Sequence, residues 1–366
     1  MERALFARVS HDSAPERANR NLYLPLLPDT FSETYMKTTL ARLFDHEYLS
    51  RDEAAAVLTE IASGAHNEVQ VAAFITVYQM RPPSVHELLG FRDALLHLAV
   101  PFHLDGLQSI DIVGTGGDHK NTFNISTLSA VVVAGAGYKV TKHGSYGVSS
   151  AVGSSNVLSA LGYQFTNDTN VLRRQLDEAG LCFLHAPLFH PALKEVAPVR
   201  RQMGMKTIFN LLGPLVNPVQ PTHNLFGTSG LEIARLYQYV MQETQRRFII
   251  IYALDGYDEI SLTGPFKVYC NTGEQTLTLE DIGAAGVAPE DLFGGDTEAE
   301  AAEIFLAVLD NRATPTQVEV VCANAGMAIH CFHPERSVED CMAEARESIV
   351  SGQAKKTLER LMASGL

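Results

Sequence analysis

Cysteines are few in this chain, long apolar runs are absent, and positive charge is scarce; each shortage argues against a class of protein. The five cysteines are odd in number and none are spaced as Cys-x-x-Cys, which argues against a structural zinc site and favours reduced thiols in a cytoplasmic protein. The longest apolar stretches, such as residues 248–254, are far shorter than a membrane span requires. We therefore expect no membrane partner.

Negative charge dominates, since 28 Lys and Arg residues face 42 Asp and Glu residues and the formal net charge is −14. This excess repels DNA and anionic lipid, so we expect no nucleic-acid partner. The opening residues MERALFARVSHD lack the apolar stretch of a secretory signal. If such a chain binds a phosphorylated substrate, it must gather positive charge locally through lysine, arginine, backbone amides or a metal ion.

The residue pattern divides the chain into three parts. Residues 1–35 show little periodicity and are interpreted as an N-terminal extension. Residues 36–100 place apolar side chains at helical spacing, and the tetrapeptides SRDE and SVHE at 50–53 and 84–87 have the form of capping boxes. They predict a helical domain, to which we expect later segments to contribute. Residues 101–366 are assigned to a second domain.

That second domain alternates strand and helix patterns, which predicts an α/β fold with a mainly parallel central sheet. Strands are expected at 110–113, 138–143, 181–186 and 248–254, with helices at 126–136, 153–162, 170–180 and 231–247 between them. The helix at 153–162 is expected to carry serines at its N-cap. Residues 266–279 predict a hairpin near one edge, and the tail beyond residue 296 is expected to be mostly helical.

A glycine-rich stretch, SIDIVGTGGDHKNTFNIST at 109–127, follows the first predicted strand. Glycines let the backbone turn tightly and bring its amides close to a ligand, and a helix beginning near residues 124–126 adds unpaired amides that attract anions. Hydroxyl and amide side chains at Thr122, Asn124, Ser126 and Thr127 add hydrogen-bond donors. The stretch predicts a phosphate cradle. It is neither a GxGxxG fingerprint nor a Walker loop, and the alternative is a capped glycine turn without a ligand.

A second constellation, KHGSYGVSSAVGSSNVLSALG, begins with Lys142 and His143 at the end of a predicted strand. Ligands of open α/β sheets bind at the carboxyl ends of the strands, so these two side chains are expected there. The following loop, 144–150, contains glycines and the serines Ser149 and Ser150, and we expect it to close over a substrate. The alternative is a surface loop with a solvated lysine.

A third segment begins with His190, just before the proline that is expected to start a helix. Arg200 lies ten residues further on, so a single helix would place the two on one face about 15 Å apart, lining one elongated cavity. The neighbouring Arg201 is interpreted as a solvated charge.

A fourth segment, ALDGYDEIS, places Asp258 and Glu259 directly after a predicted strand. Adjacent carboxylates at a strand end suit magnesium, which pairs one or two carboxylates with substrate phosphates. The alternative is an acidic turn without a metal.

Taken together, GTGGD–NIST, KHG…SS…GS, HPA…VR…T.FN.LGP..NP and DG.DE.S occur in an order that resembles the anthranilate phosphoribosyltransferase family from about residue 36 to the C-terminus. The resemblance implies a helical domain that forms a homodimer interface and an α/β domain that holds the active site. It implies transfer of phosphoribosyl from phosphoribosyl pyrophosphate to the amine of anthranilate, with release of pyrophosphate, in tryptophan biosynthesis. It also implies Mg²⁺ as cofactor.

The resemblance further implies a role for each matched residue. Phosphoribosyl pyrophosphate is expected to contact Gly114, Thr115, Gly116, Gly117, Asp118, Thr122, Asn124, Ser126, Thr127 and Lys142. Anthranilate is expected to contact Gly114, His143, Ser145, His190, Arg200, Gly213 and Pro214. The magnesium ligands are expected to be Ser126, Asp258 and Glu259. No residue is assigned as a covalent nucleophile or general base.

The sequence departs from the family pattern after His143 and Gly144, where KHGN, usually followed by arginine, is replaced by Ser145 and Tyr146. Because serine reaches less far than asparagine and carries no amide, weaker or altered binding of the aromatic amine is expected. Two alternatives to the transferase are a nucleoside phosphorylase-like enzyme and a relative that has lost the anthranilate site and binds nucleic acid.

Overall fold

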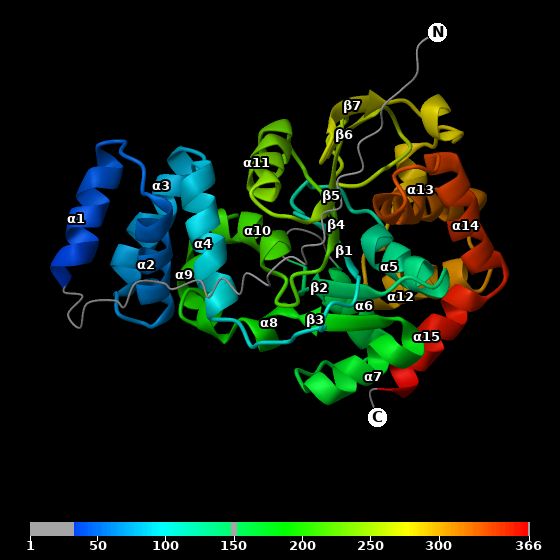
Figure 1. The fold of residues 1–366 in the computed structure, drawn as a ribbon, viewed down its shortest axis with the longest axis horizontal. Coiled ribbons are helices and arrows are strands. Elements are labelled where there is room, and N and C mark those ends of the chain that lie inside the picture. The colour runs from blue at the N-terminus through cyan, green and yellow to red at the C-terminus, as the bar shows by residue number, and fades with distance from the viewer. Residues whose placement is uncertain (1–32, 148–151, 365–366) are drawn as a thin grey trace, which may run out of the picture. The chain divides into compact units, whose positions relative to one another are not determined.

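The computed structural model describes residues 33–147 and 152–364. Residues 1–32, most of the predicted extension, lie outside the described ranges, as do Ser149 and Ser150 of the predicted substrate loop. In the described ranges the chain forms a group of N-terminal helices and an α/β domain built on a seven-stranded sheet (Figure 1). The predicted fold class is therefore confirmed.

The N-terminal helices are α1 (Glu33–Phe44), α2 (Arg51–Ala62), α3 (Glu68–Met80) and α4 (Val85–His97). The first begins before the predicted start at residue 36. Both predicted capping boxes are confirmed: the Ser50 hydroxyl accepts from the Glu53 amide and the Ser84 hydroxyl from the Glu87 amide, while each glutamate accepts from the amide of its serine. Such boxes satisfy amides that a helix start leaves unpaired, which is why these helices begin at these residues.

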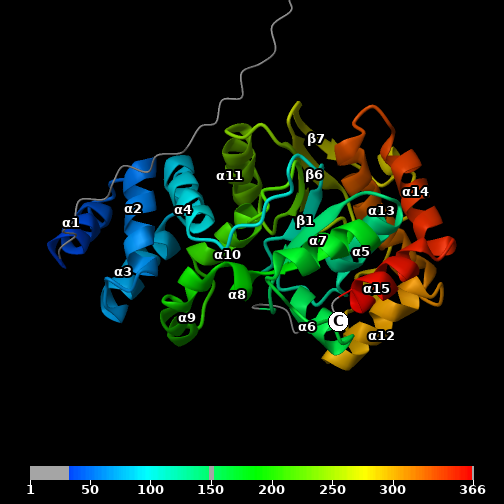
Figure 2. The same cartoon turned by 60° about the horizontal axis from the view of Figure 1, so that its bottom comes forward.

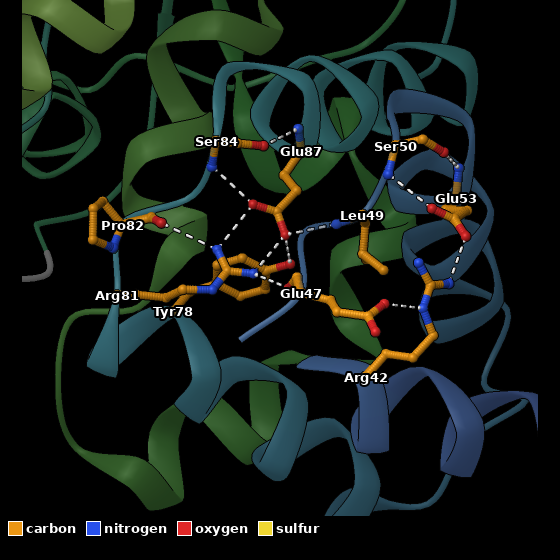
Figure 3. A network of polar contacts seen from close by, with 10 residues as sticks. All are labelled: Arg42, Glu47, Leu49, Ser50, Glu53, Tyr78, Arg81, Pro82, Ser84 and Glu87. Atoms are coloured by element: carbon orange, nitrogen blue, oxygen red, sulfur yellow. Dashed lines mark hydrogen bonds and ion pairs between the residues drawn. The ribbon is translucent and has the colours of Figure 1, made fainter. Parts of the chain in front are cut away.

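Glu87 also forms the centre of a buried polar network between these helices (Figure 3). Its carboxylate accepts hydrogen bonds from the guanidinium of Arg81, the hydroxyl of Tyr78 and the backbone amides of Leu49 and Ser84. Burial alone would raise the pKa of Glu87, but these bonds outweigh it and hold the pKa below its usual value. A carboxylate held this way ties α4 to α3 and to the residue preceding the N-cap of α2.

The sheet has the order β3-β2-β1-β4-β5-β6-β7, in which β1 to β5 run parallel and β6 and β7 form an antiparallel hairpin at one edge. The predicted hairpin is confirmed. The strands are β1 (Ile110–Gly114), β2 (Val140–Gly144), β3 (Leu181–His185), β4 (His223–Gly227), β5 (Arg247–Ala253), β6 (Phe266–Cys270) and β7 (Gly273–Leu277). Parallel strands of this kind bring the residues that follow them to a common edge.

The sequence reasoning missed β4, which lies in the middle of the sheet between β1 and β5. Its five residues, HNLFG, begin with a histidine and an asparagine and give no local strand pattern. All five are buried, and β4 aligns with β1 so that Gly227 faces Gly114. The strand forms because two neighbours supply hydrogen bonds and packing, which outweigh its weak intrinsic preference.

Helices cover both faces of the sheet (Figures 1 and 2). The hydrophobic α5 contacts β1, β2 and the long C-terminal helix α13, while α11 contacts β5 and β6. No helix in the described part of the chain is long and apolar enough to cross a membrane. The bounds are α5 (Ile125–Gly135), α6 (Ser154–Ala160), α7 (Thr169–Ala179), α8 (Ala186–Phe189), α9 (Ala197–Met203), α10 (Ile208–Leu212), α11 (Leu231–Gln242), α12 (Glu298–Leu309), α13 (Pro315–Phe332), α14 (Val338–Val350) and α15 (Gln353–Ala363).

The prediction of one helix carrying both His190 and Arg200 is wrong. A short 3-10 helix, Pro191–Lys194, is followed by a separate helix, α9, whose first turn contains Pro198. Proline fits the first turn of a helix but not its interior, so the second proline starts a new helix instead of extending the old one. Both α9 and α10 contact α3, so this segment packs against the N-terminal helices.

The prediction of a serine N-cap for α6 is also wrong, because the N-cap is Gly153 and the serines fall in the first turn. A Cβ at position 153 would lie only 2.7 Å from the Cα of Gly147 and 2.8 Å from the carbonyl carbon of Tyr146. The close approach of two loop ends therefore requires glycine there.

Candidate active site

Three of the four sequence motifs meet at the carboxyl ends of the parallel strands, and the third motif reaches the second through His190 and Gly213. The first follows β1 at Gly114, the second follows β2 at Gly144, and the acidic pair follows β5. A small cavity at this edge is lined in part by Gly114, Ser126, Asp258 and Glu259. This is the edge at which open α/β sheets bind their ligands.

Glycine is required at several positions of the first motif. Gly116 and Gly117 have φ angles of 66° and 79°, in the left-handed region that L-residues with a side chain adopt at a cost. A Cβ on Gly114 would lie 3.0 Å from the carboxyl carbon of Asp258, and one on Gly227 would lie 2.7 Å from the carbonyl carbon of the same aspartate. The two facing glycines thus make room for Asp258 between β1 and β4.

The acidic pair is held by backbone amides of the first motif. Asp258 Oδ2 accepts from the amide of Gly116 at 2.7 Å, and Glu259 Oε1 accepts from the amide of Ser126 at 3.0 Å. Burial, followed by the nearby charge of Asp118, raises the pKa of Asp258 to about 7. Burial, then Asp258 and Asp118, also raises the pKa of Glu259. The turn that carries the pair is therefore not a solvated one, since burial favours the uncharged form of both carboxyl groups.

This donor set fits a magnesium ion that is completed by substrate. Carboxylate and hydroxyl oxygens are the ligands Mg²⁺ prefers, and a buried carboxylate cluster gains from a divalent cation. In the described ranges no three His, Cys, Asp or Glu side chains converge closely enough to hold an ion by themselves. Mg²⁺ commonly uses one or two carboxylates together with phosphate oxygens, which agrees with both observations.

Lys142 lies in the interior beside this cluster, with only 2% of its surface exposed. Its ammonium donates to the carbonyl of Ile112 at 2.5 Å and to the hydroxyl of Ser126 at 3.4 Å. Burial lowers the pKa of Lys142 to about 8, while Asp111 and Glu259 oppose that shift. The alternative of a solvated surface lysine is wrong: this is a preorganised positive charge next to the N-terminus of α5.

Asp111 and Asn217 hydrogen-bond to the strand that carries the second motif. The sequence analysis assigned neither residue a role. The buried carboxylate of Asp111 accepts from the amide of His143 at 3.1 Å and from Asn217 Nδ2 at 2.8 Å. Asn217 also donates to the carbonyl of Thr141 at 2.8 Å. Burial raises the pKa of Asp111 to about 6, although Lys142 opposes the shift. The available signal was the NP that closes the third motif.

His143 and His190 form a second group, with ring centroids 5.2 Å apart. His143 Nδ1 lies 3.2 Å from the carbonyl of Gly213, and His190 Nε2 lies 2.9 Å from the carbonyl of Val216. Burial lowers the pKa of His143 well below its usual value and that of His190 to about 4, so both rings are neutral. Among the described residues, His143 Nε2 and His190 Nδ1 have no hydrogen-bond partner. Buried orphan atoms of this kind are available to a ligand.

Arg200 projects from α9 with its guanidinium carbon 5.4 Å from the centroid of the Phe209 ring. One terminal nitrogen reaches Asn210 Oδ1 at 3.4 Å, and burial lowers the pKa of the guanidinium. No carboxylate in the described part of the chain lies within ion-pair distance of Arg200. Arg201, in contrast, is exposed as predicted. Arg200 is therefore a half-buried cation suited to an anionic group of a ligand.

Lys206 is a further residue that sequence reasoning missed. Its ammonium donates to the carbonyl of Gly117 in the glycine turn, and its own carbonyl accepts from Gln79 Nε2 on α3 at 2.7 Å. The side chain thus links the third segment to the first motif. The sequence signal was a basic residue, Lys206, between the Arg200–Arg201 pair and the FN.LGP motif.

The remaining predicted residues surround these groups. Thr115 accepts from the amide of Ser229, Asn124 donates to the carbonyl of Val152 at 3.1 Å, and Thr127 is buried. Gly213 and Pro214 start the 3-10 helix that provides the carbonyl facing His143. Ser145, the residue directly after β2, is exposed.

Comparison with known proteins identifies relatives over nearly the whole described chain. Residues 37–99 match a family model described as glycosyl transferase family, helical bundle domain, and residues 106–355 match glycosyl transferase family, a/b domain. The anthranilate phosphoribosyltransferase of Cytophaga hutchinsonii is 54% identical over 325 residues, which cover 89% of this chain and 99% of the relative.

Solved structures show the same similarity. Anthranilate phosphoribosyltransferase from Thermus thermophilus superimposes with a TM-score of 0.83 and 31% identity, covering 89% of this chain and 98% of the other. The Saccharomyces cerevisiae enzyme, in complex with phosphoribosyl pyrophosphate and Mg, superimposes with a TM-score of 0.85 and 25% identity, covering 91% of this chain and 98% of the other.

Proposed function

Since the chain belongs to the anthranilate phosphoribosyltransferase family, with that family's activity in tryptophan biosynthesis, we propose which of its residues carry each part of the reaction. The similarity to anthranilate phosphoribosyltransferases favours the transferase over both alternatives, the nucleoside phosphorylase-like enzyme and the nucleic-acid-binding relative. One observation carries the proposal: the glycine turn, Lys142, Ser126 and the acidic pair share one end of the sheet.

The glycine turn and the start of α5 bind phosphoribosyl pyrophosphate in this proposal. Left-handed glycines expose consecutive amides, and the N-terminus of α5 adds its own, so anionic oxygens find donors without a large positive surface. Lys142 adds a full positive charge from inside the sheet. The phosphoribosyl pyrophosphate site would comprise Gly114, Thr115, Gly116, Gly117, Asp118, Thr122, Asn124, Ser126, Thr127 and Lys142.

Anthranilate binds beside it, between the second and third motifs. The orphan nitrogens of His143 and His190 belong to neutral rings and can bond the substrate, while Arg200 meets its carboxylate. An arginine without a protein counter-ion gains more from a carboxylate than a paired one does. The full set would be Gly114, His143, Ser145, His190, Arg200, Gly213 and Pro214.

These residues act by charge and position. Breaking the bond between the anomeric carbon and pyrophosphate leaves negative charge on the departing group, and Lys142 with the turn amides stabilises that charge. Holding the amine of anthranilate in line with the anomeric carbon can lower the barrier by up to ~7–11 kcal/mol. The proposal requires no covalent nucleophile, and no general base is assigned.

Magnesium would be held by Ser126, Asp258 and Glu259 together with substrate phosphates. When bound, the ion would neutralise charge on the pyrophosphate. We expect anthranilate fluorescence to fall when protein, phosphoribosyl pyrophosphate and Mg²⁺ are mixed, and to stay constant when a chelator removes the metal. Restoring Mg²⁺ should restore the decrease; an equal rate in chelator would contradict the metal site.

Ser145 offers a direct test of the anthranilate assignment. A Ser145→Asn variant should lower the KM for anthranilate by a few-fold, because one added hydrogen bond typically contributes ~0.5–1.5 kcal/mol. The KM for phosphoribosyl pyrophosphate should change less. Unchanged kinetic constants would refute a role for this position.

A homodimer through the N-terminal helices is part of the same proposal. Phe44 on α1 and Met80 on α3, two helices in contact, are 58% and 79% exposed, so each leaves a large apolar side chain that a partner could cover. Light scattering should give twice the 39.9 kDa chain mass, and Met80→Glu should give the monomer. Val350→Glu, at an exposed site on α14, is the control. A monomeric parent would contradict the interface.

Cytoplasmic localisation is likewise proposed. Its support is that all five cysteines are free thiols, as expected in a reducing compartment.

A further inference from the structure

One turn contacts both loops that the proposed function places on substrate. It comprises residues 292–298, which lead up to and include Glu298, the first residue of α12. We call this turn the brace. The β1–α5 loop comprises residues 115–124; of the β2–α6 loop the structure describes residues 145–147, 152 and 153, which are called its two ends. Figure 1 shows α12 beside α6, and the two helices are in contact.

The brace holds the β1–α5 loop through its backbone. The amide of Phe123 donates to the carbonyl of Leu292 at 2.9 Å, and the amide of Gly294 donates to the carbonyl of Asn121 at 2.8 Å. Asn121 Nδ2 also donates to the carbonyl of Gly295 at 3.0 Å. Thr122, between these bonds, pairs with Phe293 in an isolated antiparallel bridge. The residues leading into Asn124 and Ser126 are thereby fixed.

The approach is close enough to require glycine in the brace. A Cβ on Gly294 would lie 2.6 Å from the carbonyl carbon of Thr122 and 2.7 Å from the amide of Phe123. Real Cβ atoms do not come so near to backbone atoms, so the two chains could not pack this way with any other residue at 294.

The brace reaches the β2–α6 loop through one side chain, that of Asn156. Its Nδ2 donates to Glu298 Oε1 at 2.7 Å. Its Oδ1 accepts from the amides of both Gly147 and Gly153, at 2.9 and 3.0 Å. A single side-chain amide therefore joins the two ends of the loop to α12. Its oxygen accepts from both loop ends, and its nitrogen donates to Glu298.

The first turn of α6, which carries Asn156, also fixes the backbone of Ser145. The carbonyl of Ser145 accepts from the amide of Ser155 at 3.1 Å and from the hydroxyl of Ser154 at 3.2 Å. With the Asn156 bond to Gly147, the chain from Ser145 to Gly147 is held at two points. His143, which the proposed function places on anthranilate, lies two residues before it.

The brace is itself well anchored. Glu300 accepts from the amides of Asp296 and Thr297, and its own amide donates to the Thr297 hydroxyl at 3.2 Å. This capping box starts α12, and the brace leads directly into it. A turn locked to a packed helix is a rigid reference for both loops.

We propose that the brace sets the positions of the β1–α5 loop and of the two ends of the β2–α6 loop together, and that Asn156 is the positioning residue that connects it to those two ends. The proposal rests on the substrate roles proposed above. It predicts that damage at Asn156, outside the residues assigned to either substrate, raises the KM for both.

Exchanging donor and acceptor provides the test. Asn156→Asp keeps the oxygen that Gly147 and Gly153 need but places a carboxylate against Glu298. We expect kcat/KM for both substrates to fall by about tenfold, chiefly through KM. Adding Glu298→Gln supplies an amide donor to the new carboxylate and should recover most of the loss, to within about threefold of the parent.

Asn170→Asp, at an exposed position on α7, is the matched control and should behave as the parent. Thermal unfolding of each variant, followed by circular dichroism, separates misfolding from mispositioning, because a merely structural role would lower Tm without the shared rise in KM. Parent-like kinetics for Asn156→Asp, or a double variant no better than the single one, would overturn the proposal.

Failure of the substrate assignments would look different. In that case variants of Lys142 and Arg200 would keep parent activity. If only the brace is wrong, those variants lose activity while Asn156→Asp does not.

Discussion

Replacing Lys142 with methionine should lower kcat/KM for phosphoribosyl pyrophosphate by about 100- to 1,000-fold, the range seen when one preorganised electrostatic group is removed. The ammonium lies against the Ser126 hydroxyl and the Ile112 carbonyl, with Glu259 close enough to influence its pKa. Without it, the positive charge that contacts Ser126 beside Glu259 is lost. Methionine preserves the length of the side chain, so packing around it is largely kept. Loss of anthranilate fluorescence measures the rate.

The control is Lys139→Met. Lys139 directly precedes β2, and its ammonium donates to the carbonyl of Leu176 near the end of α7. This lysine lies at the amino end of the strand and should leave kcat/KM close to that of the parent. Thermal unfolding shows whether each variant is folded. A folded Lys142→Met enzyme with kcat/KM near that of the parent would show that the phosphates bind elsewhere.

Replacing Arg200 with alanine should raise the KM for anthranilate by about 30- to 100-fold and leave the KM for phosphoribosyl pyrophosphate nearly unchanged. A hydrogen bond to a charged group contributes ~1.5–3 kcal/mol, and loss of the ionic contact adds to that. The guanidinium is half-buried over Phe209 and has no carboxylate partner in the described residues, so no internal ion pair is broken. Initial rates at varied anthranilate measure the effect.

Arg201 supplies the matched control, because it has the same chemistry on the same helix but is exposed. Arg201→Ala should behave as the parent, and Arg200→Lys should fall between parent and alanine, since lysine keeps charge but not the bidentate fork. Equal effects at both arginines, or a changed KM for phosphoribosyl pyrophosphate alone, would contradict the role given to Arg200.

Local patterns were sufficient where a single segment decides its own structure. The capping boxes at Ser50 and Ser84, the glycine turn after β1 and the hairpin of β6 and β7 are all formed by neighbouring residues, and each was predicted. Local patterns failed where contacts between distant segments decide the structure. The buried β4 has no strand pattern, and the helix expected to join His190 to Arg200 is interrupted.

The candidate site divides in the same way. Glycine-rich and acidic motifs can be read in order along the chain, and their place after predicted strands indicates the carboxyl edge of the sheet. The burial of Lys142, the pairing of Asp111 with Asn217, and the reach of Lys206 to Gly117 depend on which segments meet. Those residues are separated by tens of positions, so no local pattern contains them.

By itself the sequence determined the class of fold, the chemistry available and the order of the motifs, because residue type and spacing control turns, caps and charge. Tertiary structure alone decided the protonation tendencies and the bracing of the loops. The reason is that desolvation and hydrogen bonding depend on distance in space: Asp258 acquires a pKa of about 7, and Asn156 meets Glu298, only when remote segments pack together.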